Sequence, residues 1–275
     1  KSFDEYIESL QDFTIGDSAP IFNLDNSYAC ISVNELWDIL LQSITGNNFK
    51  RYKECVKMVF SEKDPVYELP EEKRPFASLY EKQSRFSSRL KKGLILSMTK
   101  IVEFGEDDKT SGFCSNSVNE CNALVTEIVD KLNSRQDWFT ICEYIPDFVE
   151  ATPDVIAGVI EKNIKDEASE FWCLFENLDS SFFGRTYYTS ILWALEKLMW
   201  LEQYCIRAVY SLVKIAEKKF NYKMKNSPID SLYKFFCLWN PQGSLSLEDR
   251  ILLLSKIIKE YYFTGRNLID ILFPS

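Results

Sequence analysis

The sequence predicts an all-α protein, arranged as an irregular α–α superhelix. Apolar residues recur three or four positions apart throughout residues 184–275, and each apolar stripe needs a neighbouring helix to cover it. No run alternates with a period of two for long enough to indicate a β-strand. Helix pairs recur at intervals of roughly 35–45 residues without a shared signature, as in degenerate helical repeats. We therefore expect stacked helical hairpins of the HEAT or TPR kind.

Three apolar stripes in the last third of the chain show the helical spacing most clearly. They consist of Ile191, Leu192, Leu195, Leu198 and Met199, then Ile206, Val209, Tyr210, Val213 and Ile215, and then Ile251, Leu252, Leu254, Ile257 and Ile258. Stacked helical arrays mostly bind other macromolecules, so the fold class favours a binding function.

The first part of the chain divides into an irregular segment and a helical subregion. Residues 1–34 form the irregular N-terminal segment, with one short helix near its start and a loop over residues 15–28. Residues 35–104 form the first helical subregion, which Ser32 and Glu35 introduce with the pattern of a capping box.

A charged connection interrupts the first helical subregion. Residues 64–75 contain three prolines, which end helix propagation, and a long helical stretch follows over residues 76–104. Residues 105–117 are polar, and we expect a surface loop there. Residues 118–275 then form the C-terminal helical-repeat subregion.

Several helices of the C-terminal subregion begin with recognisable caps. Thr152 precedes Pro153 at a first helical position, and Ser227 and Ser246 each stand before a helical run. The segment Trp239–Gly243 ends a helix and turns the chain, which we interpret as a structural feature.

The composition is that of a globular, acidic chain. With 275 residues, 46% of them hydrophobic, the chain can bury a large core, and its 20 Phe, 14 Tyr and 6 Trp suit irregular packing between helices. The formal net charge of −9 disfavours nucleic acid as a partner, because phosphate binding needs a positive field. Lysines between positions 214 and 225 form one basic stretch, which a solvated helix end explains better than a nucleic-acid site.

Cysteine and histidine usage limits the chemistry of the chain. The eight cysteines form no CxxC pair and mostly lie within apolar helical patterns, so we interpret them as buried thiols of a reduced, cytoplasmic protein. The chain has no histidine, which removes Ser-His-Asp and Cys-His catalysis and the usual zinc sites. Neither a phosphate-binding glycine motif nor an apolar window long enough to span a membrane is present. We therefore expect no enzyme activity, no cofactor, no metal and no membrane partner.

Acidic pairs are the remaining catalytic candidates. They are Glu71/Glu72, Asp107/Asp108 and Glu248/Asp249, and they lie in polar loops or in the first turn of a helix. Catalytic carboxylates need burial or a closed coordination shell, which these positions do not provide. An enzyme that uses buried carboxylates elsewhere stays open as an alternative.

The candidate protein-binding residues lie in a loop before a helix. They are Phe182, Phe183, Arg185, Tyr187 and Tyr188. Aromatic residues and arginine are common at binding hot spots, so we expect this cluster to be exposed and to bind a protein. In the alternative interpretation, the loop folds back over the neighbouring helices and has only a structural role.

Three parts of the chain carry a resemblance to a known family. They are YELPEEKR at residues 67–74, with LYEK at 79–82 and SSRLKKGL at 87–94; YTSILWALE at 188–196; and NSPIDSL at 226–232, leading to LWNPQ at 238–242. These stretches resemble a helical region of large bacterial STAND-type NTPases, including the Avs-type proteins of antiviral defence. The resemblance covers roughly residues 35–275, and its motifs are structural rather than catalytic.

The resemblance implies that the chain is the sensor or scaffold part of a multidomain protein. The ATPase and effector would lie outside this chain, and the helical array would recognise a protein ligand, often from a phage, and so relieve autoinhibition or drive oligomerisation. We therefore expect a non-catalytic, cytoplasmic protein-binding module, with oligomers forming in the full-length context. The alternative is a stand-alone adaptor or scaffold that binds a host protein.

Overall fold

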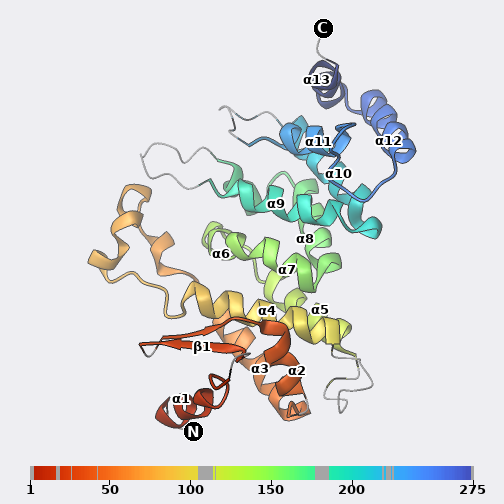
Figure 1. Cartoon of the computed structure of the whole chain (residues 1–275). Coiled ribbons are helices and arrows are strands. Elements are labelled where there is room, and N and C mark those ends of the chain that lie inside the picture. Colours follow the sequence, from red (N-terminus) through yellow and green to blue (C-terminus); the bar gives the residue numbers. More distant parts are fainter. Residues whose placement is uncertain are drawn as a thin grey trace. The chain divides into compact units, whose positions relative to one another are not determined.

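The chain is helical through most of its length. The computed structural model describes residues 3–16, 19–25, 27–41, 43–104, 114, 116–176, 186–218, 220, 224 and 226–273. Helices connected by turns make up nearly all of these residues, which confirms the all-α class (Figure 1). The repeat character of the helices stays a prediction.

The chain forms two compact units. The small unit comprises Lys1–Lys53 and Lys100–Ser117, and the large unit comprises Glu54–Thr99 and Val118–Ser275. The boundaries between the units fall inside α3 (Gly46–Phe60), inside α4 (Ser88–Phe104) and after Ser117, the first residue of α5 (Ser117–Val129).

The small unit contains a β-hairpin that the sequence analysis did not predict. Its elements are α1 (Phe3–Gln11), β1 (Ile21–Leu24), β2 (Ser27–Cys30), α2 (Val33–Leu41) and the first part of α3 (Gly46–Phe60). The strands are antiparallel, with Leu24 opposite Ser27, so the expectation of a loop over residues 15–28 is wrong for Ile21–Leu24 and for Ser27 and Tyr28. Asp25 has a left-handed φ of 48°, a conformation that aspartate tolerates in a two-residue hairpin turn.

The large unit contains the remaining elements, apart from the last part of α4. They are η1 (Pro65–Glu68), η2 (Glu71–Tyr80), α4 (Ser88–Phe104), α5 (Ser117–Val129), α6 (Arg135–Ile141), η3 (Cys142–Tyr144), α7 (Ile145–Ala151), α8 (Pro153–Lys165), η4 (Glu170–Phe175), α9 (Tyr188–Met199), α10 (Glu202–Glu217), α11 (Pro228–Phe236), α12 (Leu247–Glu260) and α13 (Tyr262–Leu272). α10 packs against α8, α9 and α11, and α13 packs against α11 and α12. Helices that follow one another in the chain therefore lie side by side (Figure 1).

Large aromatic side chains fill the core of the large unit. Trp138, Phe148 and Phe171 are almost completely buried. The rings of Trp138 and Phe171 meet edge to face with their centroids 5.1 Å apart, an arrangement that aromatic pairs favour. This core holds η4 against α6.

The helical stretch expected over residues 76–104 is present but interrupted. A 3₁₀ helix, η2, ends at Tyr80, and α4 begins only at Ser88. Glu81 follows η2 with a left-handed φ of 54°, which stops helix propagation. The connection is held by the carboxylate of Glu62, which accepts hydrogen bonds from the Ser84 hydroxyl and the Arg85 amide at 2.8 and 2.6 Å.

Two further expectations concern loops and membranes. Residues 105–113 and 115 of the expected polar loop lie outside the described residues. Among the helices that the structure describes, none combines the length and the apolar character needed to cross a bilayer.

Candidate protein-binding groove

The structure changes the interpretation of the predicted aromatic cluster. Phe182, Phe183 and Arg185 lie outside the described residues. Tyr187 and Tyr188 are only 8% and 3% exposed, so the expectation that these two tyrosines lie on the surface is wrong.

Packing against other aromatic rings explains why both tyrosines are buried. The Tyr187 ring lies 4.6 Å from that of Phe139, and the Tyr188 ring stacks on Phe175 with centroids 6.0 Å apart. Burial raises the pKa of the Tyr187 hydroxyl and keeps it neutral. These two residues therefore belong to the core of the large unit.

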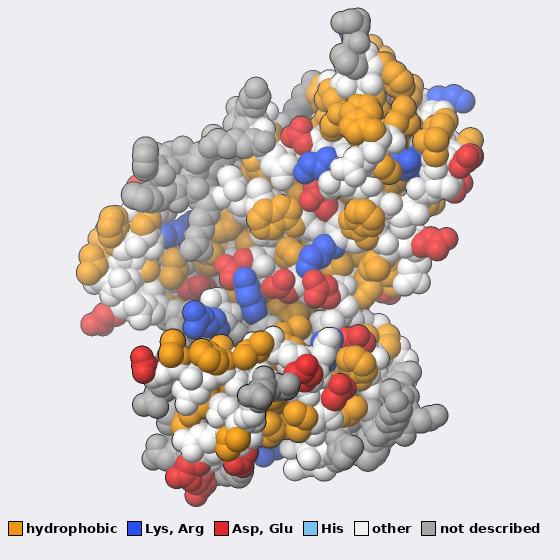
Figure 2. All heavy atoms as spheres, in the orientation of Figure 1, with side chains coloured by type: hydrophobic (Ala, Val, Ile, Leu, Met, Phe, Trp, Pro, Cys, Tyr) orange, Lys and Arg blue, Asp and Glu red, His pale blue; other side chains and the backbone are white. Residues whose placement is uncertain are grey.

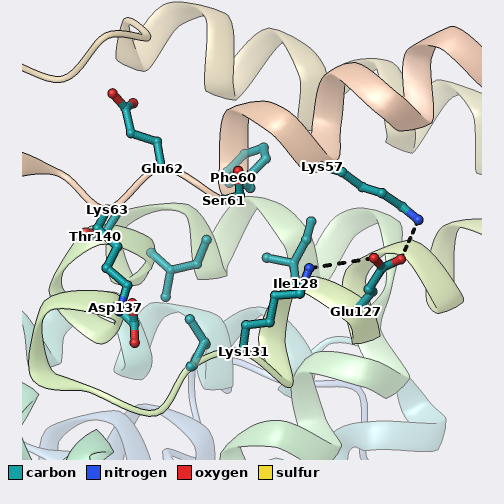
Figure 3. A pocket seen from close by; sticks show the side chains of 12 residues that line it. Lys57, Phe60, Ser61, Glu62, Lys63, Glu127, Ile128, Lys131, Asp137 and Thr140 are labelled. Atoms are coloured by element: carbon teal, nitrogen blue, oxygen red, sulfur yellow. Dashed lines mark ion pairs between the residues drawn. The ribbon is translucent and has the colours of Figure 1, made fainter.

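A pocket of about 160 Å³, whose lining includes several charged side chains, lies between α3, α5 and α6 (Figure 3). Its charged side chains pair with one another: Glu127 binds Lys57 and Lys131, and Lys63 lies 2.8 Å from the Asp137 carboxylate. Figure 3 shows Glu127 between its two lysines. The third acid of the lining, Glu62, lies 3.9 Å from Lys91, so each acid of the pocket has a cationic partner.

The pKa values of Glu127 and Asp137 agree with this pairing. The hydrogen bond from Lys57 lowers the pKa of Glu127. Burial works against ionisation of Asp137, but hydrogen bonds from Lys63, Ser134 and the Asn133 amide outweigh it and lower the pKa. Both carboxyl groups are ionised at neutral pH and so are unsuited to donate a proton as a general acid.

The acidic pairs named from the sequence do not gather into a site. Asp107 and Asp108 lie outside the described residues. The Ser246 hydroxyl accepts a hydrogen bond from the Asp249 amide at 3.2 Å, so Asp249 takes part in the N-terminal cap of α12. In the described part of the chain, no three Cys, Asp or Glu residues lie close enough to hold a metal ion together.

An apolar groove lies at the end of the large unit formed by α11, α12 and α13. It encloses about 280 Å³. Its lining residues are Phe236, Leu238, Trp239, Leu247, Arg250, Ile251, Leu254, Ser255, Ile258, Leu272 and Phe273. Figure 2 shows hydrophobic side chains gathered at this end of the large unit. We call this feature the α12 groove.

Close backbone packing sets the position of α13 beside α12. Gly265 lies on α13 where the helices meet, and a Cβ atom there would stand 2.7 Å from the Cα atom of Ile258. Only glycine permits this approach. The Thr264 amide also donates to the Glu217 carboxylate at 2.7 Å, which ties the start of α13 to the end of α10.

A buried arginine sets the position of α12 at the end of α11. Arg250 donates hydrogen bonds from Nη1 to the carbonyl oxygens of Phe235 and Cys237, at 3.2 and 3.0 Å. A cation at this place complements the negative end of the α11 dipole. Its Nε atom is buried without a hydrogen-bond partner. Among the described residues that line the groove, Arg250 alone is charged.

Two apolar stripes run along α12, and the fold buries only one of them. Leu253 and Ile257 form the buried stripe. Leu247, Ile251, Leu254 and Ile258 form a second stripe, which lines the groove and extends over about 16 Å. A surface helix of a globular protein needs a single apolar stripe, so the second one lacks a covering element in the described structure.

The rim of the groove exposes large apolar side chains. Trp239 is 74% exposed and Phe273 63%, and Ile251 on the second stripe is 52% exposed. Isolated exposed apolar residues are ordinary, but here they line one concave surface, which is typical of an interaction site. The sequence analysis missed this role, because it assigned Trp239 to a structural turn and treated the α12 residues as one stripe.

Comparison with known proteins identifies no relative: no family model, curated protein or solved structure matches the chain. The functional interpretation therefore depends on the geometry of the α12 groove and on the sequence motifs.

Proposed function

We propose that the chain is a non-catalytic helical protein-binding module, and that the α12 groove docks an α-helix of a protein. The second apolar stripe of α12 is the observation that carries this proposal. Leu247, Ile251, Leu254 and Ile258 present anchors at helical spacing, and a helix laid in the groove would cover them. The chemistry of the lining supports binding, since it is almost entirely apolar around one arginine that is already engaged.

The larger context of the proposal comes from the family resemblance. We propose that the chain is the ligand-sensing or scaffold part of a larger bacterial NTPase of antiviral defence, with a protein ligand such as a phage protein. We also propose a cytoplasmic location. Six of the eight cysteines are buried as free thiols, which supports a reducing compartment.

Affinity capture with groove variants tests the binding function. The wild-type chain and Ile251→Glu are used as baits in bacterial cells with and without phage infection. Ile206→Glu on α10 is the matched control, because Ile206 is 50% exposed and lies outside the groove. We expect one identified protein to bind wild type and control but not Ile251→Glu, since a buried glutamate would be desolvated in the groove.

The same experiment separates the alternatives. A phage protein captured only from infected cells supports the sensor, whereas a host protein captured in both conditions supports a constitutive scaffold. Equal capture by Ile251→Glu and wild type would exclude the groove as the docking site.

A further inference from the structure

The second stripe of α12 has the spacing of a coiled-coil seam. Its residues Leu247, Ile251, Leu254 and Ile258 are separated by four, three and four positions, which is the alternation of heptad positions d and a. Leucine occupies both d positions and isoleucine both a positions. Such a seam of isoleucine and leucine packs against the matching seam of another helix, with the side chains of one entering the spaces of the other. A second helix with the same pattern therefore matches the chemistry of the groove.

Charged residues at the two ends of the stripe determine the direction of such a pair. Glu248 and Lys259 are eleven residues apart, so they point in directions that differ by only about 20° around the helix. Both therefore lie on the same side of the stripe, the acid near the start of α12 at an e position and the base near its end at a b position, one step further from the seam. Neither forms an ion pair with any residue that the structure describes.

This charge pattern is complementary to itself in the antiparallel arrangement. With two α12 helices antiparallel, Ile251 of each copy faces Leu254 of the other. Glu248 of each then lies beside Lys259 of the other, and the helix dipoles oppose each other. A parallel pair would place glutamate beside glutamate and lysine beside lysine, which is destabilising.

The rim of the groove adds contacts that two short helices alone would lack. α12 has 14 residues, about two heptads, which is short for an isolated coiled coil. Trp239 and Phe273 stand at the rim, where they can pack against the second helix. Exposed aromatic anchors of this kind dominate the binding energy of many interfaces.

We infer that the α12 groove holds α12 of a second copy of this chain, so that the protein forms a two-fold dimer with antiparallel α12 helices. Such an interface uses the same surface on both copies, which is the commonest form of homo-oligomer. The inference rests on the proposed function, namely that the groove docks a protein helix, and it names the partner.

Sedimentation equilibrium over a wide range of concentrations tests the dimer. We expect wild type and the control Ile206→Glu to approach twice the monomer mass of 32.1 kDa, and Ile251→Glu to remain a monomer. The substituted side chains are half exposed in both variants, so the fold should tolerate them equally.

Charge reversal tests the antiparallel direction. Each of Glu248→Lys and Lys259→Glu should weaken the dimer about tenfold, because two symmetry-related exposed pairs become repulsive. The double variant should recover the wild-type dissociation constant. Absence of recovery would overturn the antiparallel arrangement, since a parallel pair gains nothing from exchanging the two charges.

Two outcomes would overturn the second copy as the occupant. One is a monomeric wild type at every concentration, and the other is equal dimerisation of wild type and Ile251→Glu. Suppose that the wild type is monomeric and still captures another protein, which Ile251→Glu fails to capture. In that case the proposed function stands and only the dimer is wrong.

Discussion

Arg250 on α12 donates its Nη1 to the carbonyl oxygen of Cys237, 3.0 Å away, and so fastens α12 to the end of α11. The same nitrogen lies 3.2 Å from the Phe235 carbonyl oxygen. Because α12 forms one side of the groove, this buried contact sets the shape of the proposed docking site.

Replacing Arg250 should destabilise the large unit. Arg250→Met removes the donor from two carbonyl oxygens, and we expect it to lower the free energy of unfolding by about 2 kcal/mol. Arg266→Met is the control, because Arg266 is exposed and lies 4.0 Å from Asp270 in a surface pair, whose loss should cost below about 1 kcal/mol. Urea unfolding of both variants checks the difference. If Arg250→Met is as stable as wild type or more stable, the free-energy cost of burying the charge exceeds the stabilisation from its hydrogen bonds.

Two glycine substitutions should have opposite effects. Gly265→Ala places a Cβ 2.7 Å from the Ile258 backbone, so α13 must move, and we expect a loss of about 1–3 kcal/mol. Gly158 lies inside α8 with open space around it, so Gly158→Ala should gain about 0.5–1 kcal/mol from helix propensity. Thermal unfolding measures both. A neutral Gly265→Ala would contradict the close approach of α12 and α13.

Asp137 should make stability depend on pH. Its pKa is lowered in the folded chain, so its stabilising contribution is present above the unfolded pKa of about 3.9 and is lost as the pH falls through the folded pKa. Asp137→Asn should therefore be destabilised at neutral pH, with the difference from wild type shrinking below about pH 4. Lys63→Met should show a smaller loss of the same kind, because Ser134 and Asn133 still donate. Urea unfolding across this pH range checks both variants. A stability difference between Asp137→Asn and wild type that does not change with pH would contradict a lowered pKa of Asp137 in the folded chain.

Thiol labelling should separate the cysteines by burial. Cys30 and Cys55 are exposed, and the other six are buried. Burial raises the pKa of Cys173 to about 12, which leaves almost no thiolate to react at neutral pH. Iodoacetamide should modify Cys30 and Cys55 in the native chain and all eight after unfolding. Native labelling of Cys173 would contradict the packing around η4.

Local signals in the sequence predicted helix starts well. The Ser227 cap is confirmed, with the hydroxyl accepting from the Asp230 amide, and so is the Ser246 cap. Thr152 occupies the N-cap position of α8, but its side chain makes no cap. Its hydroxyl instead donates to the Phe148 carbonyl oxygen at 3.2 Å, because Thr152 is buried at the end of α7.

The groove could not be predicted from local patterns. Trp239 and Phe273 are 34 positions apart in the sequence, and only the packing of α11, α12 and α13 brings them to one surface. The spacing of Ile251 and Leu254 shows that they share a helix face but cannot show whether another helix covers it. Tyr187 and Tyr188 show the reverse case, since tertiary packing buries a cluster that composition placed on the surface.

The most direct test of the central claim is site-specific photo-crosslinking in the cell. A benzophenone amino acid replaces Ile251 in the groove or, as the control, Ile206 on α10, and the adducts are mapped to single peptides by mass spectrometry. The account predicts that position 251 reacts with a helical segment whose apolar residues recur every three or four positions, and that position 206 does not. No protein adduct at position 251, or the same adducts from both positions, would contradict a docking site in the α12 groove.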